Sequence, residues 1–286
     1  MPKVASRAVR KPKLGQHFLS DSSTAAKIVE VLGDISQETV LEIGPGRGAL
    51  TCLLCRHARR LIAIELDRVL AAQLRMKFAL AQNLEVIEGD VLSMDFDSLF
   101  GPKPGSSRPG MEFSPRPAKV VGNLPYYITS DILLRLFEYR RYFDLLILMV
   151  QREVADRIVA KPGGSEYGLL SATTQLYAKA RRLFVLPPDA FSPPPNVHSA
   201  VIELRIAERL SDLAVPELPF INFLKLCFAQ KRKTIWNNLK SAYDPGILQS
   251  AMEATGVKPT ARAEALSLEK SAALFRMIMP TAASKN

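Results

Sequence analysis

Between residues 20 and 100 the chain alternates short apolar runs with amphipathic stretches. Apolar runs of strand length occupy residues 39–43, 60–64 and 84–87, and apolar residues at helical spacing mark residues 24–31, 49–57 and 69–80. Ser22 or Ser23 is expected to cap the first of these helices. Strands that alternate with crossover helices of this length predict a parallel sheet covered by helices on both faces.

The same alternation resumes after a break and then gives way to helices alone. Strand patterns return at residues 119–121, 144–150 and 197–206, and helical patterns at 130–137, 151–160 and 170–177. The last strand alternates polar and apolar residues, which is typical of an edge strand. Beyond residue 207 the patterns at 220–229, 234–241, 246–255 and 267–279 are all helical, and Ser267 is expected to cap the last helix. We therefore predict an α/β domain over residues 1–206 and a small all-helical domain over residues 207–286.

Two segments stand outside these patterns. Eleven of the 18 residues from 101 to 118 are Gly, Pro or Ser, which predicts a flexible surface insertion. Residues 1–13 carry five basic side chains and no acidic one, and no apolar signal-peptide stretch follows them. We interpret this segment as a basic arm on a cytoplasmic protein. No apolar run approaches the roughly 18 residues of a membrane span, so we expect no membrane partner.

Charge indicates the kind of partner. The chain has 38 Lys and Arg against 28 Asp and Glu, a formal net charge of +10. Such an excess favours a polyanionic partner, and nucleic acid more than a membrane surface. Three cysteines give no disulfide framework, which indicates a reducing compartment. Cys52 and Cys55 form a Cys-x-x-Cys pair without a second pair of ligands, so we expect no metal site.

A glycine-rich turn at a strand-to-helix junction predicts a cofactor loop. Gly44-x-Gly46-x-x-Ala49 lets the backbone turn tightly and approach a ligand. The pattern fits both a dinucleotide fingerprint and a loop that binds S-adenosylmethionine (SAM). Glu65, 21 residues after Gly44, ends the second strand and can accept hydrogen bonds from a ribose diol. Asp90 ends the third strand, where it suits an adenine amino group and favours SAM.

The run Asn123-Leu124-Pro125-Tyr126 ends the fourth strand, beside the predicted cofactor. An adenine amino nitrogen is a poor nucleophile because its lone pair is delocalised into the ring. Two oxygens that accept its hydrogens, from the Asn123 side chain and the Leu124 carbonyl, would favour the nucleophilic pyramidal form. Pro125 fixes the backbone so that this carbonyl can point at the nitrogen, and Tyr126 offers a ring on which the base can stack. Methyl transfer of this kind needs positioning and acceptors more than a strong base.

Together these motifs resemble the rRNA adenine N6,N6-dimethyltransferase family, and within it the small-subunit rRNA dimethyladenosine transferases. The resemblance spans residues 11–279. It rests on the segments 14–19 (LGQHFL), 42–51 (EIGPGRGALT), 65–67 (ELD), 89–92 (GDVL), 123–129 (NLPYYIT), 191–199 (FSPPPNVHS) and 230–234 (QKRKT).

The resemblance implies a Rossmann-like SAM-dependent methyltransferase domain followed by a helical RNA-binding domain. The positions that match its SAM contacts are Gln16, His17, Leu19, Gly44, Gly46, Glu65, Asp90, Val91 and Asn123. Those that match its target-adenine site are Asn123, Leu124, Tyr126 and Phe191, the last as an aromatic that sandwiches the flipped base. The chain departs from the family pattern in its longer 101–118 insertion and in Asn196, which stands where a basic residue is common.

The implied substrate is a pair of adjacent adenosines in a hairpin loop near the 3′ end of small-subunit (16S) rRNA, within the immature 30S subunit. Unpaired loop bases can be splayed out and stacked, which suits such a site. SAM would be the methyl donor, S-adenosylhomocysteine the product, and no metal would take part. The chain shows no obvious dimerisation helix, so we expect a monomer.

Three other functions compete with this one. A related large-subunit rRNA methyltransferase that confers macrolide resistance shares the chemistry, but the helical tail and Phe191-x-Pro-Pro-Pro favour the small-subunit enzyme. An NAD-dependent oxidoreductase would fit the glycine loop, but we find no residues for hydride transfer. A non-catalytic assembly or transcription factor could use the same fold to bind RNA.

Overall fold

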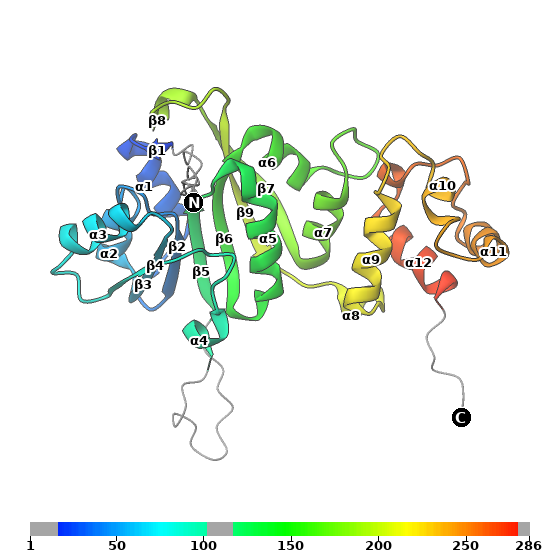
Figure 1. The fold of residues 1–286 in the computed structure, drawn as a ribbon, viewed down its shortest axis with the longest axis horizontal. Coiled ribbons are helices and arrows are strands. Elements are labelled where there is room, and N and C mark those ends of the chain that lie inside the picture. Colours follow the sequence, from blue (N-terminus) through cyan, green and yellow to red (C-terminus); the bar gives the residue numbers. More distant parts are fainter. Residues whose placement is uncertain (1–16, 102–116, 280–286) are drawn as a thin grey trace, which may run out of the picture.

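A seven-stranded sheet forms the centre of the protein (Figure 1). The computed structural model describes residues 17–101 and 117–279, so Gln16, the basic arm and nearly all of the predicted insertion lie outside the described residues. The strand order is β4-β3-β2-β5-β6-β9-β7. The strands are β2 Thr39–Ile43, β3 Arg60–Glu65, β4 Leu84–Glu88, β5 Ala118–Asn123, β6 Phe143–Gln151, β7 Ala178–Leu186 and β9 Ser199–Ile206. The pairs from β4 to β6 are parallel, which confirms the predicted α/β architecture.

Helices cover both faces of the sheet because successive strand residues point to opposite sides. On one face, Val40 joins a cluster with α1 (Ser22–Val31) and α2 (Thr51–His57). On the other face, Leu41 joins a cluster with α5 (Thr129–Glu138), α6 (Arg152–Val159) and α7 (Leu169–Tyr177). The helix α3 (Arg68–Lys77) connects β3 to β4, and the short α4 (Phe96–Phe100) precedes β5. Asp21 rather than Ser22 or Ser23 caps α1, by accepting from the backbone N–H groups of Ser23 and Thr24.

The prediction that residues 197–206 form an edge strand is wrong. The strand β9 lies between β6 and β7 and is antiparallel to both, and the edge is β7, which the sequence pattern did not reveal. The polar pattern of this strand was misleading because of Glu203, whose side chain is only 4% exposed. It accepts hydrogen bonds at 2.8 Å from Arg181 of β7 and at 3.0 Å from Arg205. A polar position that suggests a solvated face is therefore a buried ion-pair site.

A two-stranded ribbon holds the start of the described chain against a distant segment. It pairs β1 (Phe18–Leu19) with β8 (Phe191–Ser192) in antiparallel register, Leu19 opposite Phe191. The backbone N–H of Ser20 continues this contact by donating to the carbonyl of Ala190 at 2.9 Å. The ribbon therefore places His17 close to the carboxyl ends of the central strands.

Every described element after Ile206 is helical, as predicted. These helices are α8 Leu210–Leu213, α9 Glu217–Cys227, α10 Ile235–Leu239, α11 Pro245–Thr255 and α12 Leu268–Ile278. Ser267 caps α12 by accepting from the N–H of Lys270. Among the helices of the two described ranges, none has the length and apolar character needed to cross a bilayer.

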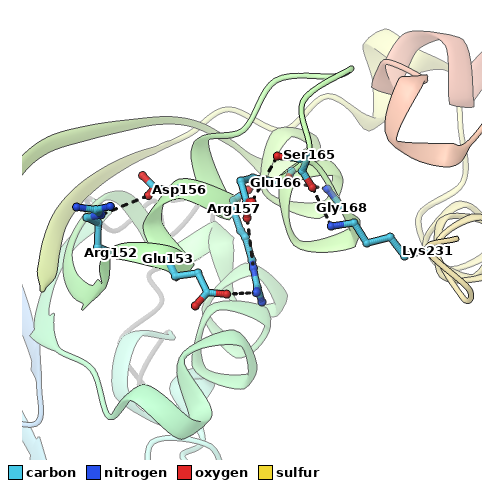
Figure 2. A network of polar contacts seen from close by, with 9 residues as sticks. Arg152, Glu153, Asp156, Arg157, Ser165, Glu166, Gly168 and Lys231 are labelled. Atoms are coloured by element: carbon cyan, nitrogen blue, oxygen red, sulfur yellow. Dashed lines mark hydrogen bonds and ion pairs between the residues drawn. The ribbon is translucent and has the colours of Figure 1, made fainter. Parts of the chain in front are cut away.

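The helical segment packs directly against the α6–α7 side of the sheet domain. One apolar cluster runs without interruption from Leu41 in the sheet to Ile278 in α12. Polar contacts reinforce it: Lys231 donates to the carbonyl of Ser165 at 2.8 Å, at the end of a network that starts on α6 (Figure 2). The sheet domain and the helical segment share this apolar cluster. The domain boundary between residues 206 and 207 therefore stays a prediction.

Candidate active site

An open cleft lies at the carboxyl ends of the central parallel strands. Ligands of open α/β sheets bind at this edge. Among the residues that line it are nine of the predicted site residues: His17, Gly44, Gly46, Glu65, Asp90, Val91, Asn123, Leu124 and Tyr126. The fold therefore brings together residues from five separate segments of the chain.

The glycine loop is shaped by close contacts that a side chain would disturb. Gly44 and Gly46 have φ values of 66° and 58°, a region that glycine adopts without strain. A Cβ at Gly46 would lie 2.7 Å from the Phe18 ring, and one at Gly44 would lie 3.3 Å from the backbone oxygen of Asn123. Phe18 is in turn covered by the guanidinium of Arg47, 4.5 Å from its ring centroid. The loop thus approaches the cleft with bare backbone.

Two carboxylates from neighbouring strand ends face the cleft. Glu65 is 3% exposed, and its two oxygens accept from the backbone N–H groups of Gly46 and Asp67, each at 2.9 Å. Burial raises the pKa of Glu65, while these hydrogen bonds act in the opposite direction. Each oxygen still has a lone pair for another donor. One oxygen of Asp90 accepts from the N–H of Leu92 at 2.9 Å, and the other has no donor among the described residues.

The Asn123 side chain is held so that its oxygen stays available. Its amide nitrogen donates to the backbone carbonyl of His17 at 2.8 Å. Because that carbonyl can only accept, the NH₂ end must face it and Oδ1 must face away. The N–H of Leu124 donates to the carbonyl of Met149 at 3.0 Å, whereas the Leu124 carbonyl has no donor within the described chain. Pro125, with φ of −58°, fixes the backbone that follows. Two adjacent acceptors therefore lie in one corner of the cleft.

Tyr126 is fixed from both ends of its side chain. Its hydroxyl shares a 2.6 Å hydrogen bond with Ser199, and its ring stacks on the imidazole of His17 with centroids 6.0 Å apart. His17 is anchored through Nδ1, which donates to the carbonyl of Pro193 at 2.8 Å. Burial raises the pKa of Tyr126, which keeps the phenol neutral. The result is a rigid aromatic wall beside Asn123.

Two predicted site residues lie away from this cleft. Leu19 lines a smaller adjoining cavity, which also borders Gly46 and Asn123. Phe191 lines neither cavity: it is 3% exposed and packs in the core beside Leu19. Because its ring is covered, the expected role of Phe191 in sandwiching a base is not available in this arrangement.

Sequence reasoning assigned no role to several residues that the structure places at the site. Leu66, Tyr127 and Phe18 line the main cleft, and Glu42 lines the smaller cavity. Glu42 is 1% exposed and accepts a 2.7 Å hydrogen bond from the hydroxyl of Thr51, and burial raises its pKa to about 7. All four residues lie inside the motif segments quoted above. Their closeness in sequence to the predicted site residues was the signal that could have identified them.

The parallel sheet, the glycine loop, the strand-end acids and the Asn-Leu-Pro-Tyr corner together define a Rossmann-like SAM-dependent methyltransferase. Comparison with known proteins narrows this class. The family model for ribosomal RNA adenine dimethylase matches residues 8–279. The chain belongs to this family, which sets aside the oxidoreductase and the non-catalytic factor.

Relatives and solved structures agree with this assignment. The ribosomal RNA small subunit methyltransferase A of Koribacter versatilis is 53% identical and covers 96% of this chain and 98% of its own. The enzyme of the same name from Acidobacterium capsulatum is 50% identical and covers 94% of this chain and 91% of its own. The crystal structure of a dimethyladenosine transferase from Plasmodium falciparum has a TM-score of 0.74 at 25% identity, covering 90% and 96%. The 23S rRNA methyltransferase ErmE has a TM-score of 0.65 at 27% identity, covering 91% and 99%.

Proposed function

We propose that this enzyme uses SAM to dimethylate N6 of two adjacent adenosines in a hairpin loop near the 3′ end of small-subunit (16S) rRNA. It acts as a monomer on the immature 30S subunit, in the cytoplasm. The names of the relatives at 53% and 50% identity support the small-subunit target. The observation that carries the chemistry is the pair of acceptors, Asn123 Oδ1 and the Leu124 carbonyl, in the same cleft as Glu65 and Asp90.

The residues of the cleft fit the cofactor. The lone pairs left on Glu65 suit a ribose diol, and the open oxygen of Asp90 suits an adenine amino group. The bare backbone at Gly44 and Gly46 leaves room that a Cβ would fill. The smaller cavity, with Leu19 and Glu42, would take the amino-acid end. When bound, SAM supplies an electrophilic methyl group on a sulfonium.

The corner at Asn123 prepares the target nitrogen. In the first transfer, Asn123 Oδ1 and the Leu124 carbonyl each accept a hydrogen bond from N6, which favours a pyramidal nitrogen with its lone pair released from the ring. In the second transfer N6 carries one hydrogen, and one of the two oxygens accepts from it in the same way. The proton displaced by each methyl group leaves to solvent. Tyr126, held by Ser199 and His17, presents a ring face that orients the base. Preorganised acceptors of this kind act without rearranging during the reaction, which is the main source of their catalytic effect.

The test is methyl transfer from radiolabelled SAM to immature small ribosomal subunits, followed by nucleoside analysis and primer extension. We expect N6,N6-dimethyladenosine at two adjacent positions of the small-subunit rRNA and no label in large-subunit rRNA treated in parallel. Label confined to 23S rRNA would identify the macrolide-resistance type of enzyme instead. Absence of dimethyladenosine in both rRNAs would overturn the proposal.

A further inference from the structure

Tyr127 is exposed at the mouth of the cleft, unlike any other Phe, Tyr or Trp of residues 17–101 and 117–279. Its side chain is 64% exposed and lines the cleft next to Tyr126. Its hydroxyl has no hydrogen bond, and its ring no aromatic partner, among the described residues. The fold therefore gives this ring no packing role, although an aromatic side chain usually buries a large apolar surface.

The backbone that carries Tyr127 is rigid. Residues Tyr126–Ile128 form a 3₁₀ turn, closed by the N–H of Ile128 donating to the carbonyl of Pro125 at 3.2 Å. The hydroxyl of Thr129 donates to the same carbonyl at 3.2 Å, and α5 begins at Thr129 without a connecting loop. The ring is thus presented from a fixed base, one residue beyond the ring that orients the target adenine.

We propose that Tyr127 is the stacking platform for the nucleotide adjacent to the target adenosine. This inference rests on the proposed function, in which the two modified adenosines are neighbours. While one adenine lies at Asn123 and Tyr126, the next base must lie just outside the cleft, where Tyr127 is exposed. Aromatic rings accept any base by its face, so the platform does not depend on N6 hydrogens. A finished dimethyladenosine can therefore occupy Tyr127 while its neighbour enters the cleft.

The test compares Tyr127→Ala, Tyr127→Leu and Tyr127→Phe in steady-state methylation of immature small subunits. Losing a stacked base raises KM for subunits roughly 10-fold in the Ala and Leu variants, while kcat stays within about twofold. Tyr127→Phe keeps the ring and behaves like wild type. The affinity for S-adenosylhomocysteine, measured by calorimetry, is unchanged in all three. Leu134→Ala, on α5 and outside the cleft lining, is the matched control for losing an exposed apolar side chain.

A substrate change tests the same contact from the RNA side. Subunits whose rRNA carries uridine in place of the neighbouring adenosine offer a weaker stacking surface. They raise KM for the wild type and leave KM of Tyr127→Ala unchanged. The effects of the uridine replacement and of Tyr127→Ala on KM are therefore non-additive if the base and the ring are in contact.

Three results would overturn the proposal. The first is a wild-type KM in Tyr127→Ala. The second is a parallel loss of S-adenosylhomocysteine affinity, which would make Tyr127 a cover for the cofactor. The third is a Tyr127→Leu variant as good as Tyr127→Phe, which would make it an apolar wall. If the wild-type enzyme itself gave no dimethyladenosine, the proposed function would fail first, and that result is distinct from all three.

Discussion

One amide group at Asn123 serves two purposes. Its nitrogen ties the β5 end to the backbone of His17, and in the proposed function its oxygen accepts from the substrate. The contact with the His17 carbonyl explains why the amide cannot flip, and so why Oδ1 stays free of this carbonyl in a residue that lines the cleft. The side chain is thus positioned before the substrate arrives, which is the condition for an electrostatic contribution to catalysis.

Replacing Asn123 should separate chemistry from binding. We expect Asn123→Ala to lower the methylation rate of immature subunits by roughly 10²–10³-fold, the usual effect of removing one preorganised polar group. Binding of the variant to those subunits, measured by co-sedimentation, should stay close to wild type because the net charge of +10 is unchanged. A fully active variant would show that the Asn123 oxygen is not needed.

Glu42 should make stability depend on pH. Its pKa is raised from 4.5 to about 7 by burial, so the folded protein prefers the protonated form. Its contribution to stability is therefore complete below pH 4.5 and is lost as pH rises through about 7. Relative to Glu42→Gln, which cannot ionise, the wild type should lose roughly 2 kcal/mol of unfolding free energy between pH 5 and 8. Urea unfolding of both proteins at these pH values measures the difference. Parallel pH profiles would show that Glu42 is not perturbed in this way.

At the scale of elements, the glycine loop and the β1–β8 ribbon are interlocked. A Cβ added at Gly46 would lie 2.7 Å from the Phe18 ring, and Phe18 belongs to the ribbon strand that follows His17. The glycine loop therefore packs close to a strand that is itself held by β8, a strand far away in sequence. A change at Gly46 acts on the site through this contact as well as through backbone strain.

Gly46→Ala should weaken cofactor binding. The added Cβ would lie 2.7 Å from Phe18, in a backbone conformation that alanine rarely adopts. Strain of this kind costs about 1–3 kcal/mol, so we expect the affinity for S-adenosylhomocysteine to fall at least about 10-fold. Gly33→Ala is the matched control, because Gly33 also has positive φ but has nothing within 4 Å of the added Cβ. Equal affinities for the two variants in calorimetry would contradict a specific role for the loop.

The elements differ in how well the sequence predicts them. Strand β2 and the parallel strands beside it are rich in apolar residues, Val40 and Leu41 among them, so their burial was evident from the sequence. The burial of strand β7 in the sheet was not evident, because Arg181 and neighbouring residues are polar. The charge of Arg181 is neutralised by Glu203 on the adjacent strand β9. Such long-range pairing leaves no local signal.

The site, too, has features that the sequence predicts and features that depend on long-range pairing. Glu65 ends β3, Asp90 lies two residues beyond the end of β4, and Asn123 ends β5, so their meeting at one sheet edge follows from topology. The fixed orientation of the Asn123 amide does not follow, because it depends on His17 from another segment. The burial of Phe191 escaped prediction for the same reason, since its neighbour Leu19 is brought there by the ribbon.

At the scale of the whole molecule, Arg140 ties the sheet domain to the helical segment. Its guanidinium forms ion pairs with Glu208 at 2.5 Å and with Glu217 at 3.0 Å, and it lies over the ring of Tyr177. The Tyr177 hydroxyl donates to Glu217 at 2.7 Å. These contacts fix how the helical segment lies relative to the sheet domain.

Neighbouring arginines allow a controlled test of this contact. We expect Arg140→Met to lower the unfolding free energy by roughly 2 kcal/mol, because two carboxylates lose a shared and largely buried partner. Arg141→Met removes an exposed pair with Asp97 and should cost less than about 1 kcal/mol. Denaturant unfolding of both variants gives the comparison. A larger loss in Arg141→Met would show that Arg140 does not join the two parts.

The most direct test of the whole account is a crystal structure of the enzyme with S-adenosylhomocysteine and adenosine. We predict that the cofactor product lies along Glu65 and Asp90, and that adenosine N6 lies about 3 Å from both Asn123 Oδ1 and the Leu124 carbonyl. Adenosine bound with N6 turned away from Asn123, or S-adenosylhomocysteine bound outside the glycine cleft, would contradict it.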